Sequence, residues 1–410
     1  MATEQNFGKW NFALFLLGFA LYLTDIGTDL WVAAVYYIDG YRVWALLVLL
    51  VILVSAVILQ SFSWSWYEDD ENNPDLGNPG SVCGRWCRRV LHIFQMGVLF
   101  RYIKALDYGY RAAFKTEDTH RKAIYSVTDL SMLRLFEAFL ETAPQLVLQA
   151  FILLKSDDRE YIQYVSVILS CMSMSWATLD YYAALKKSLS DQPKLTCGFP
   201  SLLYFFYKLL TLNAKILLIT LLATTNVIVV IVYLCVLWLV MLICVFVQNT
   251  NFCTSTIQEV IYKAVVAIIL VFTFFNIKNN NTRLVMTLYY TFRILETVSL
   301  LVFCWFLKCS AVDKDFDFPV SVTIGLSLIL GVICLVLYYS YCHPTRANDQ
   351  DVEGSDNTQE LQTFCDEVDG CLSKKPTVIL NNINENSTTI HSTVAKSRNI
   401  NSRLANCLSV

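Results

Sequence analysis

Charged residues are scarce in this chain, and that scarcity excludes most proteins of aqueous compartments. Only 16% of the 410 residues are charged, whereas a soluble domain usually carries about 25%. Apolar residues make up 56% of the chain and aromatic residues 14%. The formal net charge of −3 leaves no excess of bases for a nucleic-acid partner. These proportions indicate a membrane protein and argue against nucleic-acid binding.

Motifs that carry catalytic chemistry are missing as well. The sequence contains no nucleotide-binding glycine loop, no nucleophile triad and no cluster of metal ligands. Its 14 cysteines form no disulfide framework, because most of them lie inside apolar runs, where cysteine acts as a small hydrophobe. Cys83 and Cys87 are the one close pair, and no second pair follows at zinc spacing. We therefore expect neither an enzyme nor a cofactor.

Long apolar runs fill the first 345 residues. A membrane-spanning helix needs about 20 apolar residues, and backbone groups in lipid must bond within their own segment, which forces helices. Ten segments meet or approach this length: 11–37, 43–67, 90–106, 124–154, 161–185, 200–223, 226–248, 255–277, 284–307 and 318–342. Segments 90–106 and 255–277 are the weakest, because both carry charges.

The placement of basic residues decides how these segments cross the membrane. Ten spans would put nine bases inside and ten outside, which is no bias. If 90–106 and 255–277 are re-entrant, five bases lie outside and fourteen inside, as the positive-inside rule requires. The predicted fold is an all-α polytopic membrane protein with eight transmembrane helices, two re-entrant helix hairpins and both termini in the cytosol.

A short internal repeat divides the membrane region. Arg134-Leu-Phe-Glu137 and Arg293-Ile-Leu-Glu296 each lie in a span that follows a proposed hairpin. Internal repeats are common in membrane transport folds. We therefore expect two pseudo-symmetric halves and a tail, with boundaries at 1–187, 188–345 and 346–410.

Ionisable residues inside the apolar runs are the candidate functional residues. Each charge at the bilayer centre costs about 2.5–3.5 kcal/mol, so these side chains must pair, meet water, or do both. The set is Asp25, Asp29, Arg101, Asp129, Arg134, Glu137, Glu141, Asp180, Lys208 and Lys215. Acids predominate in the first half and Lys208 and Lys215 begin the second, which predicts a polar seam between the halves.

Two interpretations of these charges stay open. They are buried ion pairs that fix helix packing, or they line a hydrated path, which we favour for the set because acids are in excess. Pro144, shortly after Glu141, interrupts a long helix and predicts a kink beside the acids.

The composition changes at Arg346, where a polar tail begins. Residues 346–369 hold eight acids and one base, and residues 370–410 hold five bases and one acid. At the boundary stands Asp366-Glu367-Val368-Asp369-Gly370. This string resembles the preferred recognition sequence of executioner caspases of the caspase-3 type, which cut after Asp and before a small residue. Because an exposed polar segment can enter a protease cleft, we expect cleavage after Asp369.

Four stretches of the membrane region resemble the XK family. They are Tyr22–Trp31, Gln60–Trp66, Asp129–Gln145 and Phe272–Asn276. The resemblance covers roughly residues 10–345. It implies a caspase-activated, ATP-independent phospholipid scramblase of the plasma membrane that exposes phosphatidylserine on apoptotic cells and also moves phosphatidylcholine.

The same resemblance implies the fold and the partners. Eight spans and two re-entrant hairpins in two pseudo-symmetric halves are expected, together with a single-span immunoglobulin partner, basigin or neuroplastin, that one branch of the family needs and another does not. The intramembrane acids of the family map onto Asp25, Asp29, Asp129, Glu137 and Glu141. Lys215 stands where a relative carries Arg, and the resemblance leaves it able to pair with Glu141, without a bidentate fork. Two other functions stay open, a secondary transporter for a small solute and a structural membrane partner that transports nothing.

Overall fold

The computed structural model describes residues 7–72, 85–115, 119–155, 161–188, 198–248, 253, 255–275, 282–308 and 317–342, and within these ranges the chain is helical apart from short turns. The helices are α1 Lys9–Ile38, α2 Arg42–Asn72, α3 Arg85–Ile93, α4 Gly97–Phe114, α5 His120–Glu137, η1 Ala138–Thr142, α6 Ala143–Lys155, α7 Tyr161–Ser188, α8 Phe199–Thr225, α9 Val227–Val247, α10 Thr256–Phe272, α11 Thr282–Lys308, α12 Asp317–Leu337 and η2 Tyr338–Cys342. The tail and its caspase motif, 366–370, lie outside these residues.

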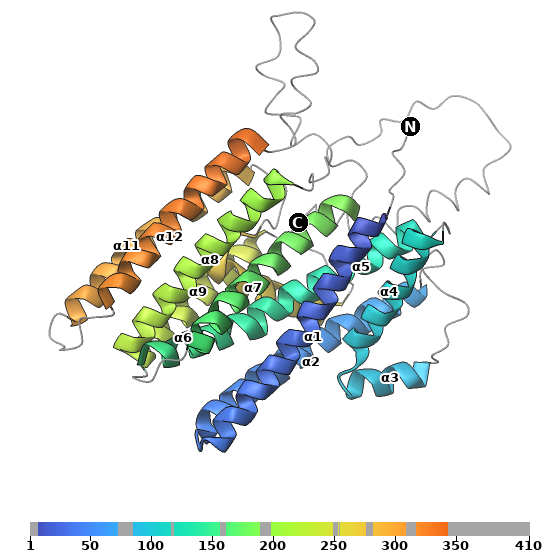
Figure 1. The fold of residues 1–410 in the computed structure, drawn as a ribbon, viewed down its shortest axis with the longest axis horizontal. Helices are drawn as coiled ribbons and strands as arrows, with labels where there is room; N and C mark the ends of the chain where they lie inside the picture. The colour runs from blue at the N-terminus through green and yellow to red at the C-terminus, as the bar shows by residue number, and fades with distance from the viewer. Residues whose placement is uncertain are drawn as a thin grey trace, which may run out of the picture.

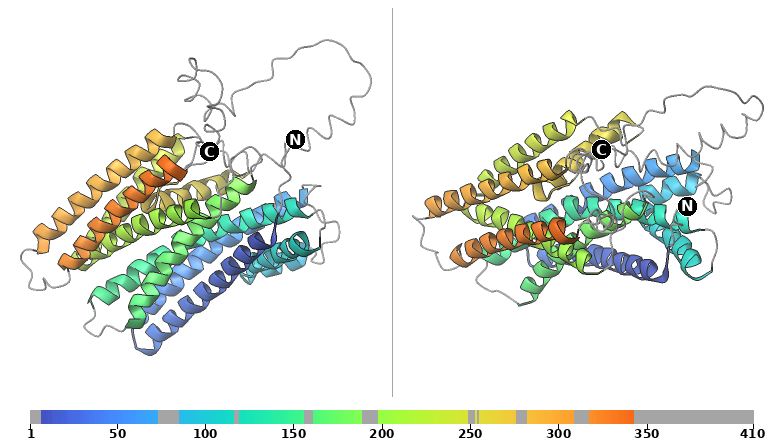
Figure 2. Two further views of the ribbon diagram at one scale, coloured as in Figure 1. Left: turned by 45° about the horizontal axis from the view of Figure 1, so that its top comes forward. Right: turned by 90° about the horizontal axis from the view of Figure 1, so that it is seen from above.

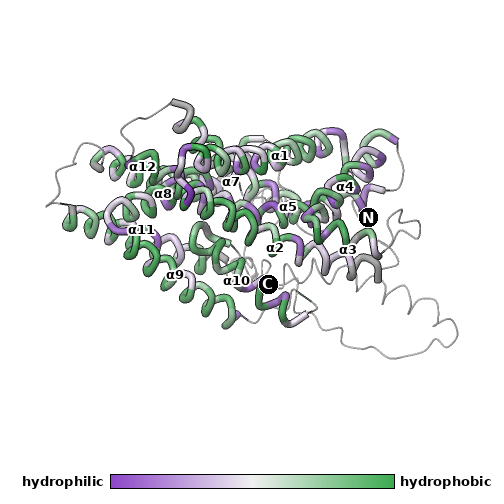
Figure 3. Tube along the Cα trace, turned by 90° about the horizontal axis from the view of Figure 1, so that it is seen from below, coloured by the Kyte–Doolittle hydropathy of each residue, from purple (hydrophilic) through white to green (hydrophobic). Residues whose placement is uncertain are grey.

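The long helices run side by side in one bundle (Figures 1 and 2). Helix α8 lies inside it and packs against α12, α11 and α9 on the side of the second half and against α6 and α7 on the side of the first. Two thirds of the most apolar stretch of α8 is buried, compared with 11% of that of α9, although α9 has the higher mean hydropathy, 3.3 against 1.6. An apolar helix with an exposed surface needs an apolar solvent, and Figure 3 shows hydrophobic residues along α9 and α11 at the outside of the bundle.

Seven helical stretches in the described part of the chain are long and apolar enough to cross a bilayer, which makes the chain a multi-pass membrane protein. They are Lys9–Ile38, Arg42–Tyr67, His120–Lys155, Phe199–Thr225, Val227–Val247, Leu284–Leu307 and Phe318–Ser340. The sequence predicted eight. Helix α7 is the remaining long helix, with 28 residues, but it carries Asp180 and ends in Lys186 and Lys187.

The predicted interruption near Pro144 takes the form of a π-helical turn. Helix α5, η1 and α6 form one continuous helical stretch, and η1 covers Ala138–Thr142. Pro144 has no backbone N–H to donate to the preceding turn, and a single π turn is a common way to absorb such a local mismatch. The turn places Glu141 inside the bundle, where it is buried.

The segment predicted as 90–106 is two helices joined at a sharp turn. Helix α3 ends at Ile93, Gln95 takes a positive φ of 62°, and α4 begins at Gly97. Gln60 of α2 donates to the Gln95 carbonyl at 2.8 Å. A Cβ on Gly97 would come within 2.5 Å of both Gln60 and His92. The turn therefore packs tightly against α2 at Gln60, and the absence of a side chain on Gly97 permits this contact.

Contacts along α2 show that α3 and α4 lie on the same stretch of that helix. His92 of α3 lies 3.2 Å from the Ser63 hydroxyl, and Arg101 of α4 donates to the hydroxyl and the carbonyl of the same serine, each at 3.2 Å. One turn further, Lys104 lies over the Tyr67 ring. Helix α4 thus runs from the level of Gln60 back toward Tyr67, where the apolar span of α2 ends. Figure 1 shows α3 and α4 meeting at an angle beside the bundle.

Helix α10 ends inside the bundle. Its last residues, 269–272, are buried, and it is followed by extended residues from Thr273. Arg293 of α11 lies 3.5 Å from the carbonyls of Val271 and Phe272. Arg293 comes eleven residues after Thr282, the first residue of α11, which is about 16 Å along a helix axis. Helix α10 therefore ends about 16 Å, along the axis of α11, from the residue at which α11 begins.

The contact of α8 with α12 depends on a small residue. A Cβ on Gly331 would meet Cγ2 of Thr211 at 2.8 Å and its backbone nitrogen at 3.2 Å, whereas a Cβ on Gly325, in the same helix, would meet nothing within 4 Å. Small residues let membrane helices approach closely and gain van der Waals contact.

We predict that Gly331→Ala destabilises the bundle and that Gly325→Ala does not. Overpacking at Gly331 should cost roughly 1–3 kcal/mol, while both changes bring the same gain in helix propensity. Thermal unfolding of the two variants in detergent compares them directly. Equal melting temperatures would show that α8 and α12 do not touch at this glycine.

Candidate functional site

Carboxylates from three elements converge in the first half of the bundle. Thr142 of η1 donates to Oδ2 of Asp25 on α1 at 3.0 Å. Asp29, one turn further along α1, interacts electrostatically with Asp25 and with Glu141. Glu137 does so with all three. Asp29, Glu137 and Glu141 are each about 95% buried. We call these four residues the acid cluster.

One base accompanies the acid cluster. Arg134 donates to the Gly18 carbonyl of α1 at 2.7 Å, and it interacts electrostatically with Asp25, Glu137 and Asp180 of α7. Among the described residues, none of these five acids lies within 4.0 Å of a basic group. The acids outnumber their only basic neighbour by five to one, so pairing within this half cannot neutralise them.

A small cavity opens at the acid cluster. Asp25, Arg134, Glu137 and Thr142 line it together with Tyr22 and residues of α7. The centre of a water molecule can occupy about 10 Å³ of it, which is room for about one water. The cavity is thus polar enough to be hydrated and too narrow for a lipid headgroup.

Arg101 and Asp129 belong to a different place. Arg101 donates to Asp129 at 3.3 Å and stacks over the Tyr67 ring at 4.2 Å. Asp129 comes eight residues before Glu137, about 12 Å along the helix. This pair holds α4 against α2 and α5 and is separate from the acid cluster.

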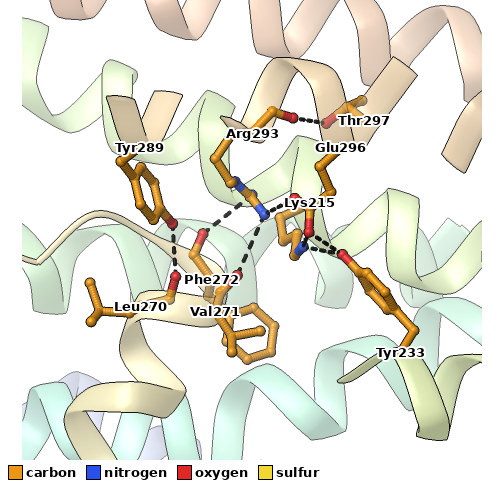
Figure 4. A network of polar contacts seen from close by, with 9 residues as sticks. All are labelled: Lys215, Tyr233, Leu270, Val271, Phe272, Tyr289, Arg293, Glu296 and Thr297. Carbon is orange, nitrogen blue, oxygen red and sulfur yellow. Dashed lines mark hydrogen bonds and ion pairs between the residues drawn. The ribbon is translucent and has the colours of Figure 1, made fainter. Parts of the chain in front are cut away.

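The second half contains a buried network with the opposite charge balance (Figure 4). Lys215 of α8 and Arg293 of α11 both bind the Glu296 carboxylate, at 3.0 Å and 2.9 Å. Tyr233 of α9 donates to the same carboxylate and accepts from Lys215. Arg293 also reaches the last carbonyls of α10, where the helix dipole is negative. We call Lys215, Tyr233, Arg293 and Glu296 the basic network.

Lys208 lies near the basic network and stabilises the end of α10 as well. Its Nζ donates to the Thr273 hydroxyl and the Phe274 carbonyl, each at 2.9 Å. The side chain is 3% exposed and lies over the rings of Tyr204 and Tyr207. The partners of the Lys208 ammonium group are therefore a hydroxyl, a carbonyl and two aromatic rings instead of a carboxylate.

The polar seam predicted between the halves is wrong in its pairing. Lys215 binds Glu296 rather than Glu141. Where α10 meets α5 and η1, the contacts are aromatic, Phe136 with Tyr262 and Phe139 with Phe272. These rings lie on the same helical stretch as Glu137 and Glu141 and face the other half. Among the described residues, Lys215 therefore pairs within its own half and does not neutralise the acid cluster.

Three members of the basic network were missed as functional candidates. Arg293 and Glu296 appeared in the sequence only as the second copy of the repeat, and Tyr233 lies in the most apolar run of the chain. The repeat itself was the available signal. Each copy is an Arg and a Glu three residues apart, one helical turn, in the span after a proposed hairpin.

Comparisons with known proteins assign this chain to a family. A sequence model of the family described as XK-related protein matches residues 13–344. This chain belongs to the XK-related family. It is 35% identical to XK-related protein 8 of Pan troglodytes over 355 residues, which cover 86% of this chain and 88% of that protein. It is 34% identical to XK-related protein 9 of Tetraodon nigroviridis, over 83% of this chain and 93% of the relative.

We predict that Glu296→Gln is far more destabilising than Lys215→Met. Without Glu296, two buried bases lose their shared carboxylate, at a cost of about 3–5 kcal/mol. Without Lys215, Arg293 and Glu296 still form a neutral pair. Thermal unfolding in detergent measures both changes.

Asp107→Asn is the matched control for that comparison, because Asp107 forms an exposed pair with Arg111 and exposed pairs contribute about 0–1 kcal/mol. Similar losses for Glu296→Gln and Lys215→Met would mean that the two bases do not share one carboxylate.

Proposed function

We propose that this chain is a phospholipid scramblase that stays at rest until a caspase of the caspase-3 type cuts its tail after Asp369. The observation that carries the proposal is the acid cluster, whose buried carboxylates inside membrane-spanning helices have no basic group of the described residues within 4.0 Å. Membership of the XK-related family supports it.

The acid cluster is costly as a purely structural feature. Placing four ionised, unpaired acids in the hydrocarbon region would cost on the order of 10 kcal/mol of insertion free energy. This cost is comparable to the free energy of unfolding of a whole domain. Buried ionisable residues in membrane helices usually mark a substrate or ion pathway. A hydrated path along these acids lowers the barrier for a zwitterionic or anionic headgroup while its acyl tails stay in the bilayer.

The narrow cavity corresponds to the resting form in this proposal. It has room for about one water, so scrambling requires α1 to separate from α5 and η1. Two of the contacts that join these elements are the hydrogen bonds from Thr142 to Asp25 and from Arg134 to the Gly18 carbonyl. Cleavage at Asp366-Glu367-Val368-Asp369-Gly370 is the proposed trigger for this separation.

The topology in the proposal is that expected from the charges. Helix α7 is the eighth span, α3 with α4 and α10 with its extended continuation are re-entrant, and both termini face the cytosol at the plasma membrane. Two contacts support the re-entrant segments. The turn before Gly97 reaches only the level of Gln60 on α2, and α10 stops near Arg293.

The proposed cargo is phosphatidylserine and phosphatidylcholine, moved without ATP and without any covalent step. A single-span partner, basigin or neuroplastin, is proposed for delivery to the plasma membrane rather than for lipid movement, since each acid of the cluster comes from this chain. Reconstitution of the chain alone therefore tests the core of the proposal.

We predict that the purified chain scrambles fluorescent phospholipids in proteoliposomes after caspase-3 treatment and not before. Asp369→Ala should abolish the activation and leave the fold unchanged. If the Asp369→Ala variant scrambles lipids after caspase treatment, cleavage after Asp369 is not what activates the protein. Saturable solute uptake driven by an ion gradient, with no lipid movement, would favour a secondary transporter.

The same assay separates a lipid path from structural pairing. Glu137→Gln should slow scrambling by about tenfold, the factor that a loss of 1.4 kcal/mol produces, while its melting temperature stays equal or rises, because a buried unpaired acid is removed. Asp107→Asn, an exposed carboxylate on α4, is the control. A Glu137→Gln protein that melts earlier and scrambles normally would make the acid cluster structural.

A further inference from the structure

A groove between α2 and α3 lies apart from both charged clusters. Val57, Gln60, Ser61 and Trp64 of α2 form one wall, and Arg89, His92 and Ile93 of α3 with Gln95 of the following turn form the other. Its volume is about 410 Å³ and it is wide open on one side, within the range of about 300–1,000 Å³ usual for small-molecule sites. Apolar surface makes up most of the walls.

The groove lies at the edge of the membrane. The apolar span of α2 ends at Tyr67, so Trp64 is about one turn below the end and Val57 about 15 Å below it. Trp64, Trp66 and Tyr67 cluster at this level, as aromatic residues do where hydrocarbon meets water. A molecule in the groove would therefore extend from the headgroup region into the acyl-chain region.

The water-facing end of the groove is basic. Arg89 precedes His92 by one turn, and His92 contacts Trp64 and Tyr67 edge-on, so Arg89 lies toward the end of α2. Among the side chains that the structure describes, those that line the groove include no acid. Helix α3 has three arginines among its nine residues. Guanidinium groups bind phosphate oxygens through paired hydrogen bonds.

Helix α3 also faces lipid with apolar side chains. Trp86, Ile93 and Phe94 are each more than 70% exposed, and they share this short stretch with the arginines. Exposed apolar side chains next to basic ones are typical of a helix that lies at a membrane interface and is attracted to anionic lipids.

We propose that the groove between α2 and α3 binds one anionic phospholipid. Its phosphate accepts hydrogen bonds from Arg89, and an acyl chain lies against Val57, Trp64 and Ile93. Basic pockets between membrane helices recognise anionic headgroups in this way. The site is independent of the scrambling proposal, because it shares no residue with the acid cluster and a lipid bound here need not move.

Trp64 provides the readout, since bromine atoms on an acyl chain quench a tryptophan that they touch. Purified full-length protein in detergent is titrated with dibrominated phosphatidylserine and with phosphatidylcholine that carries the same brominated chain. The difference in fluorescence quenching between the wild-type protein and the Trp64→Phe variant measures the lipid bound in the groove. We expect phosphatidylserine to reach half-maximal quenching at about tenfold lower concentration than phosphatidylcholine, as one charge-assisted contact permits.

Arg89→Gln should remove this preference, and Arg121→Gln, which removes an exposed arginine at the beginning of α5, should retain it. Both variants should keep the wild-type melting temperature. The proposal fails if the two lipids quench Trp64 equally. It fails also if Trp64→Phe leaves the quenching unchanged, because the lipid would then bind elsewhere.

Discussion

A charge inside a bilayer must have an opposite charge, a dipole or water beside it, and the two halves of this protein meet that requirement in different ways. The second half uses protein groups. Lys215 and Arg293 share Glu296, Arg293 reaches the carbonyls that end α10, and Lys208 binds the residues that follow. Each of these three bases has a partner within hydrogen-bond distance. In the first half, the acid cluster and Asp180 have Arg134 as their basic neighbour, and Arg134 donates to a carbonyl instead of a carboxylate.

This difference connects the fold to the proposed activity. A helix that ends inside a membrane leaves carbonyls without partners, and the bases of the second half supply donors to those of α10. The basic network is thus a satisfied and rigid element. Water is the remaining partner for the acid cluster, and the small cavity beside Asp25 and Glu137 is where it would enter. An element with unmet polar groups has the most to gain from opening, so we place the moving part in the first half.

The fold was largely predictable from the sequence because hydrocarbon leaves few alternatives. Apolar length located the spans, and charges identified both weak segments. The turn at 94–96 inside the segment 90–106 was not predicted, since it depends on contact between Gly97 and Gln60, which a one-dimensional pattern does not contain. Seven helical stretches of the described chain are long and apolar enough to span, one fewer than predicted, and α7 is the remaining long helix.

The partners of the candidate residues were harder to predict than the residues themselves. The family resemblance suggested Glu141 as the partner of Lys215, but Glu296, 81 residues further along the chain, lies beside it. Arg101 was expected among the path residues and instead binds Asp129 and Ser63. Rotation of a helix about its axis decides such pairings, and in an almost uniformly apolar sequence the hydrophobic pattern hardly fixes that rotation.

Opening of the acid cluster to water is the central claim, and chemical access to it is the direct measurement. Ser173 of α7 lines the cavity, so Ser173→Cys places a thiol there, and its reaction with a cationic, headgroup-sized thiosulfonate is measured against the parent protein before and after caspase treatment. The account predicts no added labelling in the uncut protein and rapid labelling after cleavage. A thiol that stays unreactive while the cleaved protein scrambles lipid would show that headgroups cross elsewhere.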